Sequence, residues 1–491
     1  MVPSSYDRRA GHPPGCPSGV TGTLRVVAAK PAGHQPLAGR SGRTRTVGDN
    51  AGRGSRNRQA AAGYPVAARY LSAEIDEIRR GSVTVVRIAH FTDASVVGVN
   101  GIASSIGLLT RTLRGRGHDC VVVSAGPLWG GTGGDVIWVP SVPTGMGSFR
   151  FVPFPLAGMR DRAKAWQPDV VHVHTPGPLG AAGISIAREL GIPAVYTYHT
   201  DMHGYAGQYF IPAGVIRACT AVYGRHLGRG EPGRRAGRYE VVEAANARVF
   251  ASAEVIIAPT EAALRRCRME PYAEKIQIIA TPAGLPPVTG PGGPAGAVFR
   301  GRYGIPAGSP VVLFVGRLTA EKGVGLLVDA FAQVLARVPA ATLVLVGPES
   351  RTLRLGRLLD RAGLGAHTVR TGALTGAGVQ EAYRAGTVFA FPSATDTQGI
   401  VLHEAALAGL PIVMTDPVLH AGHPLAGAAH LAGAGPDGLA AGLCALLLSP
   451  EEARDRGERG RLLASELTAD RFADETLRAY HDAVGAAAGR I

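Results

Sequence analysis

The sequence predicts an α/β protein built from two doubly wound, Rossmann-like domains. Short apolar runs of strand length alternate with helical patterns from Val83 onward, which is the βαβ rhythm of a parallel sheet. A segment rich in Pro and Gly, Thr281–Ala297, interrupts this rhythm, which then restarts. The chain has 491 residues, of which 46% are hydrophobic, so it is too long for one ordinary domain and apolar enough for two cores.

The first 82 residues are expected to form a disordered, basic extension (1–82). They are rich in Gly, Pro, Ser and Arg and show no sustained periodicity, apart from a short helical pattern around Ala67–Arg80. They hold 13 Lys/Arg and 5 Asp/Glu, which is more than half of the net charge of +14. The remainder is mildly basic, which suits anionic ligands or an anionic membrane surface. It carries no nucleic-acid-binding motif, so no nucleic acid partner is expected.

The chain shows no stretch of about 18 apolar residues that would predict a transmembrane helix. No apolar segment near the N-terminus predicts a secretory signal. The five cysteines are scattered without a CxxC pair, so we expect reduced, buried thiols and not a disulfide or zinc framework. These features predict a cytoplasmic protein, with peripheral association at the inner face of the cell membrane as an option.

The first domain is predicted at residues 83–284. Its strands are expected to be buried on both faces, because the runs are continuously apolar. The expected strands are Val83–Phe91, Cys120–Ser124, Val170–His174, Ala194–Tyr198 and Val255–Ala258. Helices are expected at about Gly101–Arg116 and Leu156–Trp166. Residues Met202–Glu240 are irregular and basic, which fits either a solvated loop or an excursion that faces the membrane or an acceptor.

The second domain is predicted at residues 285–467, after a hinge in the Pro- and Gly-rich segment. Its expected strands are Val311–Val315, Thr342–Val346, a run near His367–Thr371, Val388–Phe391 and Pro411–Met414. Helices are expected from about Glu321, at Ile400–Ala408 and at about Pro450–Leu467. A last helix within residues 468–491 is a candidate to pack back on the first domain. Doubly wound sheets bind ligands outside the carboxyl ends of their strands, so two such domains predict a ligand cleft.

Two motifs in the second domain predict a site for a nucleotide diphosphate sugar. In "FVGRLTAEKG" a strand ends and a helix begins. Gly316 permits close approach of the backbone to a ligand, and Arg317 and Lys322 flank the turn. Helix N-termini attract phosphate, and two cations there would neutralise a diphosphate. Two ordinary surface cations around a helix start would give the same pattern.

The second motif is "SATDTQGIVLHEAALAGLPIV". Asp396 lies in the loop after a strand, and Glu404 lies about one turn into the next helix. The amides at the N-terminus of that helix belong to Thr397, Gln398, Gly399 and Ile400. Glu404 can accept two vicinal ribose hydroxyls, and Asp396 can accept hydroxyls of a sugar. The spacing predicts a ligand with a ribose at one end, a diphosphate in the middle and a hexose at the other.

Candidate residues of the first domain lie where strands end. Asn100 and Gly101 stand in a glycine-bearing loop without the GxGxxG pattern, which argues against a dinucleotide site. His172 and His174 end one strand. The residues at the end of the next strand, expected on the acceptor side, are Tyr198, His199 and Asp201. The histidines suggest a metal, but no carboxylate trio completes a site, so neither a metal nor a cofactor is expected.

From about Val83 to its end, the chain resembles a retaining family-4 glycosyltransferase of the GT-B fold. "GRLTAEKG" and "SATDTQGIVLHEAALAGLPIV" match the two donor-site motifs of that family. The family usually has two Glu separated by seven residues, and here Asp396 replaces the first Glu at the same spacing. "VGPES" at 346–350 and the loop after Met414 also depart from the usual glycine-rich turns. Within the family, the motifs most resemble members that glycosylate diacylglycerol or phosphatidylinositol.

The resemblance implies transfer of a hexose from a nucleotide diphosphate sugar to an acceptor hydroxyl, with retention at the anomeric carbon. It implies that Arg317 and Lys322 hold the diphosphate and stabilise its departure. Glu404 would bind the ribose, and Asp396 with residues 397–400 would address the transferred sugar. The residue matching His174 lines the family's active site beside the reacting sugar. The sugar, the base and the acceptor stay open, with glycerolipid, phosphatidylinositol and small molecules as acceptor candidates.

Two alternative functions are compatible with the same predicted fold. One is a nucleotide-sugar 2-epimerase, which isomerises its substrate without an acceptor. The other is a catalytically silent partner protein that binds a nucleotide sugar, and the replacement at Asp396 motivates it.

Overall fold

The computed structural model describes residues 85–97, 100–126, 134–144, 149–152, 157–202, 238–267, 269–284, 292–350, 352–374 and 376–489. The predicted extension (1–82) with its short helix lies outside these ranges, as do most of the basic segment Met202–Glu240 and residues 285–291 of the predicted hinge. The described residues therefore cover the two predicted sheets and the helices around them.

The first sheet has seven parallel strands in the order β3-β2-β1-β6-β7-β8-β9. The central strands are apolar and fully buried, as expected for strands covered by helices on both faces. The strands are β1 (Arg87–Thr92), β2 (Asp119–Gly126), β3 (Val136–Pro140), β6 (Val170–Val173), β7 (Ala194–Thr197), β8 (Val255–Ala258) and β9 (Ile276–Ile278). A separate antiparallel pair joins β4 (Val142–Pro143) to β5 (Arg150–Phe151).

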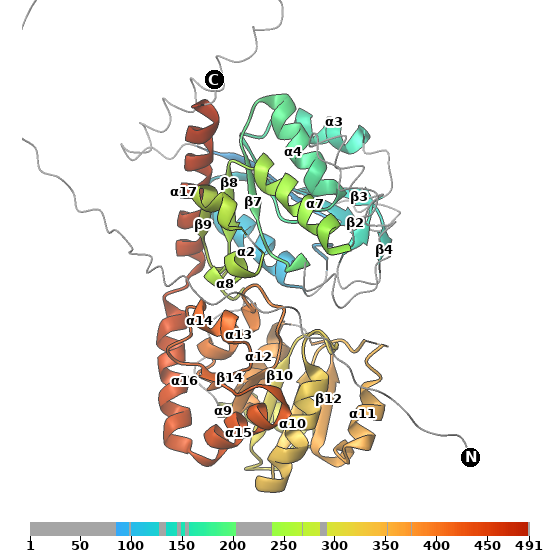
Figure 1. The fold of residues 1–491 in the computed structure, drawn as a ribbon, viewed down its shortest axis with the longest axis vertical. Coiled ribbons are helices and arrows are strands. Elements are labelled where there is room, and N and C mark those ends of the chain that lie inside the picture. Colours follow the sequence, from blue (N-terminus) through green and yellow to red (C-terminus); the bar gives the residue numbers. More distant parts are fainter. Residues whose placement is uncertain are drawn as a thin grey trace, which may run out of the picture. The chain divides into compact units, whose positions relative to one another are not determined.

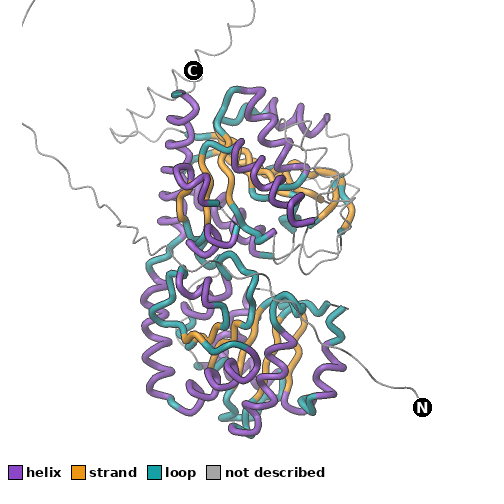
Figure 2. The backbone as a smooth tube through the Cα atoms, in the orientation of Figure 1, coloured by secondary structure: helices purple, strands orange, loops and turns teal. Residues whose placement is uncertain are grey.

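Helices flank this sheet along its strands (Figures 1 and 2). They are α2 (Gly101–Gly115), α3 (Ala157–Ala165), α4 (Pro178–Leu190), α7 (Arg238–Ser252), α8 (Glu261–Arg266) and the 3-10 helix η1 (Glu270–Lys275). The C-terminal helix α17 (Ala469–Ala488) also packs here, although the whole second sheet lies between it and η1 in the sequence. Its Phe472 and Tyr480 share one buried cluster with Ile88 of β1 and Leu109 of α2.

The second sheet has six parallel strands in the order β12-β11-β10-β13-β14-β15. They are β10 (Val311–Val315), β11 (Thr342–Val346), β12 (Thr368–Gly372), β13 (Val388–Phe391), β14 (Ile412–Met414) and β15 (His430–Leu431). Its helical elements are α9 (Gly293–Arg302), α10 (Val324–Arg337), α11 (Leu355–Arg361), η2 (Gly365–His367), α12 (Gly376–Ala385), α13 (Ile400–Leu407), α14 (Pro417–Ala421), α15 (Gly435–Leu448) and α16 (Pro450–Ser465). Two buried clusters, one on each side of the sheet, form its core.

The predicted fold class, two Rossmann-like doubly wound sheets, is confirmed. In each sheet the strand order reverses once, between β1 and β6 in the first and between β10 and β13 in the second. Ligands of open α/β sheets bind beside such reversal points, at the carboxyl ends of the strands. The loops that follow these four strands are therefore where the chemistry is expected.

Most predicted elements begin and end within about two residues of the observed ones, and three differences are larger. Strand β1 begins at Arg87 and not at Val83. Helix α10 begins at Val324 because Gly323 before it adopts a left-handed conformation with a φ of 71°. Helix α9 begins at Gly293, inside the segment expected to be a hinge, and packs against α12, where Gly292 donates its N–H to the carbonyl of Arg384. In the described part of the chain, no helix has both the length and the apolar character needed to cross a bilayer.

Candidate active site

The loop after β10 brings two strand ends into unusually close backbone contact. Gly316 and Gly347 adopt φ values of 152° and 140°. A Cβ atom on Gly347 would lie 1.9 Å from the carbonyl oxygen of Gly316, so no side chain fits there. Arg317 follows and forms an ion pair with Glu321, one turn along the chain, whose carboxylate is buried. In the turn that precedes α10, the guanidinium of Arg317 is therefore fixed by the carboxylate of Glu321.

Lys322 and Asp396, one from each donor motif, are ion-paired. The ammonium nitrogen lies 2.5 Å from Oδ1 of Asp396, and only 20% and 17% of the two side chains are exposed. Burial acts to raise the pKa of Asp396, but the charge and hydrogen bond of Lys322 outweigh it and hold the pKa below its usual range. Asp396 is therefore ionised at neutral pH and held at a defined place between β13 and α13.

Helix α13 begins directly behind this carboxylate. Gly399, the N-cap residue before the first helical residue Ile400, has a φ of 74°, and a Cβ there would lie 2.8 Å from the ring of Phe391. No side chain caps this helix end, so its first amides are turned toward the loop that holds Asp396. Ile400 faces the start of α2, because a Cβ on Gly101 would lie 3.5 Å from its side chain. Helix α2 of the first sheet and α13 of the second thus begin side by side.

The side chains of Gln398 and Thr397, two residues expected at the donor, bind the first domain and the segment that leaves it. Gln398 is buried, and its amide group accepts from the N–H of Thr281 at 3.0 Å and donates to the carbonyl of Thr281 at 2.7 Å. The Thr397 hydroxyl donates to the carbonyl of His199 at 2.8 Å. These side chains anchor the loop, so any contact of theirs with a donor is left to their backbone amides.

The first domain holds the same loop from helix α8 and its cap, which the sequence did not indicate. Arg266 donates to the carbonyl of Asp396 at 2.8 Å and forms a buried ion pair with Asp416 at the start of α14. The Thr260 hydroxyl donates to the carbonyl of Thr397 at 2.5 Å. No pattern around Arg266 distinguishes it from its neighbour Arg265, so only the tertiary structure finds it.

Glu404 lies one turn into α13, as predicted, and has a partner that the sequence did not indicate. The hydroxyl of Tyr383, a buried residue of α12, donates to Oε2 of Glu404 at 2.7 Å. Burial raises the pKa of Glu404 to about 7, although the Tyr383 hydrogen bond acts in the opposite direction. Glu404 is thus poised between its neutral and ionised forms at neutral pH, and its ionised form is the better acceptor for hydroxyl groups.

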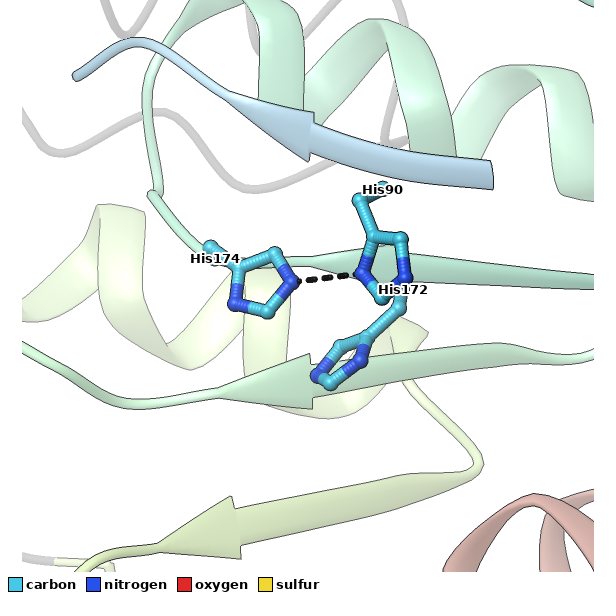
Figure 3. Close-up of side chains that lie close together, drawn as sticks. All are labelled: His90, His172 and His174. Carbon is cyan, nitrogen blue, oxygen red and sulfur yellow. Dashed lines mark hydrogen bonds between the residues drawn. The ribbon is translucent and has the colours of Figure 1, made fainter. Parts of the chain in front are cut away.

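A cluster of histidines lies at the carboxyl ends of β1 and β6 (Figure 3). His174 is only 2% exposed, so its side chain lies beneath the surface and not on it. It pairs with His90 of β1 on one side and with the half-buried His199 on the other, at 3.0 Å each. His90 was not a candidate, although a histidine within the apolar run of β1 is a signal that could have been used.

One ring nitrogen from each of His90, His172 and His174 lies within 4.8 Å of the other two, which is compatible with a metal ion. The histidine set considered from the sequence had His199 in place of His90. Hydrogen bonds already engage both nitrogens of His172, with Tyr480 at 2.8 Å and Thr197 at 2.6 Å. His174 likewise uses both ring nitrogens, in hydrogen bonds to His90 and His199, whereas Nε2 of His90 has no hydrogen-bond partner.

The other candidates of the first domain have local partners. Asn100 caps α2, accepting from the N–H of Ala103 at 2.8 Å and donating to the carbonyl of Ser95 at 3.0 Å. Tyr198, expected on the acceptor side, is fully buried between aromatic rings and offers no surface to a ligand. Asp201 is also buried. Among the residues predicted after β7, His199 is therefore the one with an accessible side chain.

Comparisons with known proteins identify the family of the chain. Residues 99–283 match the sequence profile of Glycosyltransferase Family 4, and residues 309–449 match that of Glycosyl transferases group 1. A GDP-mannose-dependent alpha-mannosyltransferase of Mycobacterium tuberculosis is 31% identical over 346 residues, which cover 67% of this chain and 79% of that protein. An alpha-monoglucosyldiacylglycerol synthase of Streptococcus pneumoniae is 26% identical over 344 residues, covering 67% and 70%.

Solved structures show the same fold. The crystal structure of Anabaena HepE in complex with UDP superposes with a TM-score of 0.57 and 16% identity, covering 80% of this chain and 99% of that one. The two parallel sheets, the two donor motifs and the relatives lead to one conclusion: the chain belongs to the family-4 glycosyltransferases of the GT-B fold and is a hexosyltransferase that uses a nucleotide sugar.

Proposed function

We propose that the protein transfers a hexose from a nucleotide diphosphate sugar to a lipid hydroxyl, with retention of configuration at the anomeric carbon. The observation that carries the proposal is the Lys322–Asp396 pair at the start of α13, with Glu404 one turn further on. It places a cation, an ionised acid, helix amides and a second acid in the order that a hexose–diphosphate–ribose ligand requires.

The donor would bind along this row. An ammonium group has three N–H donors, and the Asp396 bond uses one of those of Lys322, so phosphate oxygens can bind without breaking the ion pair. Arg317 and the amino end of α13 would add positive potential around the diphosphate. Asp396 would accept hydroxyls of the hexose, and Glu404 would accept those of the ribose. The proposal assigns no metal or cofactor, because these groups can neutralise the diphosphate.

The proposed reaction keeps both partners on one face of the sugar. The acceptor oxygen forms a bond to the anomeric carbon as the bond from that carbon to the diphosphate oxygen breaks. The electron pair of that bond goes to the leaving diphosphate, which also takes the proton of the acceptor hydroxyl. Catalysis then rests on stabilising the departing charge, chiefly by Arg317 and Lys322. No side chain is needed as a covalent nucleophile.

A lipid acceptor is proposed because one similar protein is named a monoglucosyldiacylglycerol synthase and because the chain is basic. An anionic membrane surface would attract such a chain, which places the enzyme peripherally at the inner face of the membrane. GDP-mannose is the first donor to examine because the M. tuberculosis relative is named for it, and UDP-glucose is the second because HepE was crystallised with UDP.

The test is incubation of the purified full-length chain with each donor, with and without vesicles that contain diacylglycerol and phosphatidylinositol. The expected product is a glycolipid whose anomeric configuration, read by NMR, equals that of the donor. Inversion would contradict the mechanism, and transfer only to water-soluble acceptors would contradict the lipid assignment. Binding of a nucleotide without turnover, restored by Asp396→Glu, would instead support the silent partner protein.

A further inference from the structure

Three imidazoles form a continuous hydrogen-bonded row that runs inward from the candidate site. His199 Nε2 lies 3.0 Å from His174 Nδ1, and His174 Nε2 lies 3.0 Å from His90 Nδ1. His174 therefore uses both ring nitrogens within the row, and Figure 3 shows its inner bond to His90. The row ends at His90 Nε2, which is buried and has no hydrogen-bond partner.

The three rings are neutral at physiological pH. Burial lowers the pKa of His90 to about 3 and that of His199 to about 4, and it holds the pKa of His174 well below the usual range. A neutral imidazole carries one N–H, so three rings bring three protons to the row. Each hydrogen bond needs one donor and one bare nitrogen.

Only two arrangements satisfy both bonds. In the first, His90 donates from Nδ1 to His174, which donates from its own Nδ1 to His199, leaving His199 with its proton on Nδ1. In the second, every proton sits on Nε2, the bonds point inward, and Nδ1 of His199 is bare. The two arrangements hold the same number of protons, and changing one ring forces the other two to change.

The surroundings of His90, at the buried end of the row, favour one of the two arrangements. In the second arrangement His90 would bury an N–H with no acceptor, whereas in the first it buries only a bare nitrogen. Buried N–H groups without a partner are rarer in proteins than under-satisfied acceptors, which favours the first arrangement. His199 then presents an Nδ1–H at the half-buried end of the row, next to its own carbonyl, which receives the hydroxyl of Thr397 from the donor loop.

We propose that His90 is a positioning residue that acts through His174 to hold His199 as a hydrogen-bond donor to a substrate oxygen. The proposal rests on the proposed place of His199 on the acceptor side. It implies that His199 orients the acceptor and does not remove its proton, so the proton is left to the departing diphosphate.

His172 lies beside the row but outside it. Its ring lies 4.0 Å from that of His174 between centroids, tilted by 34°, yet both of its nitrogens bond elsewhere, to Tyr480 and Thr197. Removing the Tyr480 hydroxyl should therefore disturb the cluster without changing the row. The variant Tyr480→Phe is the matched control for any change at His90.

The direct test needs no variant and no activity. Nitrogen-15 NMR of the ring atoms in histidine-labelled, full-length protein distinguishes Nδ1–H from Nε2–H, with assignments from single substitutions. We expect the Nδ1–H form at His90, His174 and His199. An Nε2–H form at any of the three, a charged ring, or a stoichiometric metal in elemental analysis of the protein would overturn the proposal. Since the readout is spectroscopic, its outcome is independent of which donor or acceptor is correct.

The coupling between the proton positions of His90 and His199 is tested by the variant His90→Met, because a thioether is a weak acceptor that cannot donate. His174 should then place its proton on Nε2, and His199, which does not touch His90, should change to the Nε2–H form. We expect kcat/KM for the acceptor to fall about tenfold, as for one lost neutral hydrogen bond, with the donor KM unchanged. Tyr480→Phe should leave the His199 form unchanged. If His199 kept its Nδ1–H form in the His90→Met variant, the proposed coupling would be overturned.

Discussion

Replacing Arg266 by Ala should weaken both the fold and the donor site, because this side chain serves two partners. Its guanidinium forms an ion pair with Asp416 and donates to the carbonyl of Asp396 at 2.8 Å. Only 14% of the Arg266 side chain and 3% of the Asp416 side chain are exposed. The variant would therefore leave a buried carboxylate without its cation and the donor loop without one of its anchors.

The magnitude follows from these contacts. Breaking a buried ion pair by removing one partner costs roughly 3–5 kcal/mol. Asp416 keeps two backbone hydrogen bonds, from the N–H groups of Val418 at 3.0 Å and Leu419 at 3.1 Å, so we expect the lower end, about 3 kcal/mol. The lost bond to the Asp396 carbonyl adds about 1 kcal/mol to the free energy of donor binding, which is a several-fold rise in the donor KM.

The assay combines initial rates over a range of donor concentration with thermal unfolding of the same preparations. Arg265→Ala is the matched control, since this neighbour on α8 is 59% exposed and pairs with the exposed Glu261. Exposed pairs contribute about 0–1 kcal/mol, so its unfolding temperature and donor KM should match the wild type. Equal effects of the two substitutions, or an unchanged donor KM in Arg266→Ala, would refute the reasoning.

Three further variants test the donor site. Arg317→Ala should lower kcat by about 10²–10³-fold, as for one lost oxyanion donor, and undiminished turnover would contradict its role at the diphosphate. Glu404 accepts hydroxyls best when ionised, so the donor KM should fall as pH rises through about 7. Tyr383→Phe should shift this transition to higher pH because it removes the bond that lowers the pKa of Glu404, and an unshifted KM profile would refute the coupling. Gly347→Ala should lower the unfolding temperature and raise the donor KM, since its Cβ would meet the Gly316 oxygen at 1.9 Å.

Two of these variants, Arg317→Ala and Gly347→Ala, have matched controls in the same domain. Arg370→Ala removes an Arg of β12 that is 48% exposed and should leave kcat unchanged. Gly356→Ala adds a methyl group in α11, which meets no atom within 4 Å apart from its neighbours along the helix, and should leave the unfolding temperature equal or higher. A loss of function in either control would point to a general disturbance of the second domain.

The sequence alone determined the elements and the order of the donor site. Continuous apolar runs predict buried parallel strands, and β8, β10, β11 and β13 begin and end where the runs do. Local patterns also placed Glu404 one turn into α13, because helix starts and periodicity are short-range properties. The short helices between the strands were less predictable, and α9 was mistaken for part of a hinge because its Pro and Gly residues resemble a linker.

Only the tertiary structure decided which side chains meet. His90 and His174 are 84 residues apart, and Arg266 reaches a carbonyl 130 residues away, because the order of strands in a sheet differs from their order in the chain. Exposure could not be read from the sequence either: Tyr198 packs against the rings of Tyr196 and Phe250 and is fully buried, whereas its neighbour His199 is half-buried. Contacts and burial are properties of the packed sheets, and no local pattern encodes them.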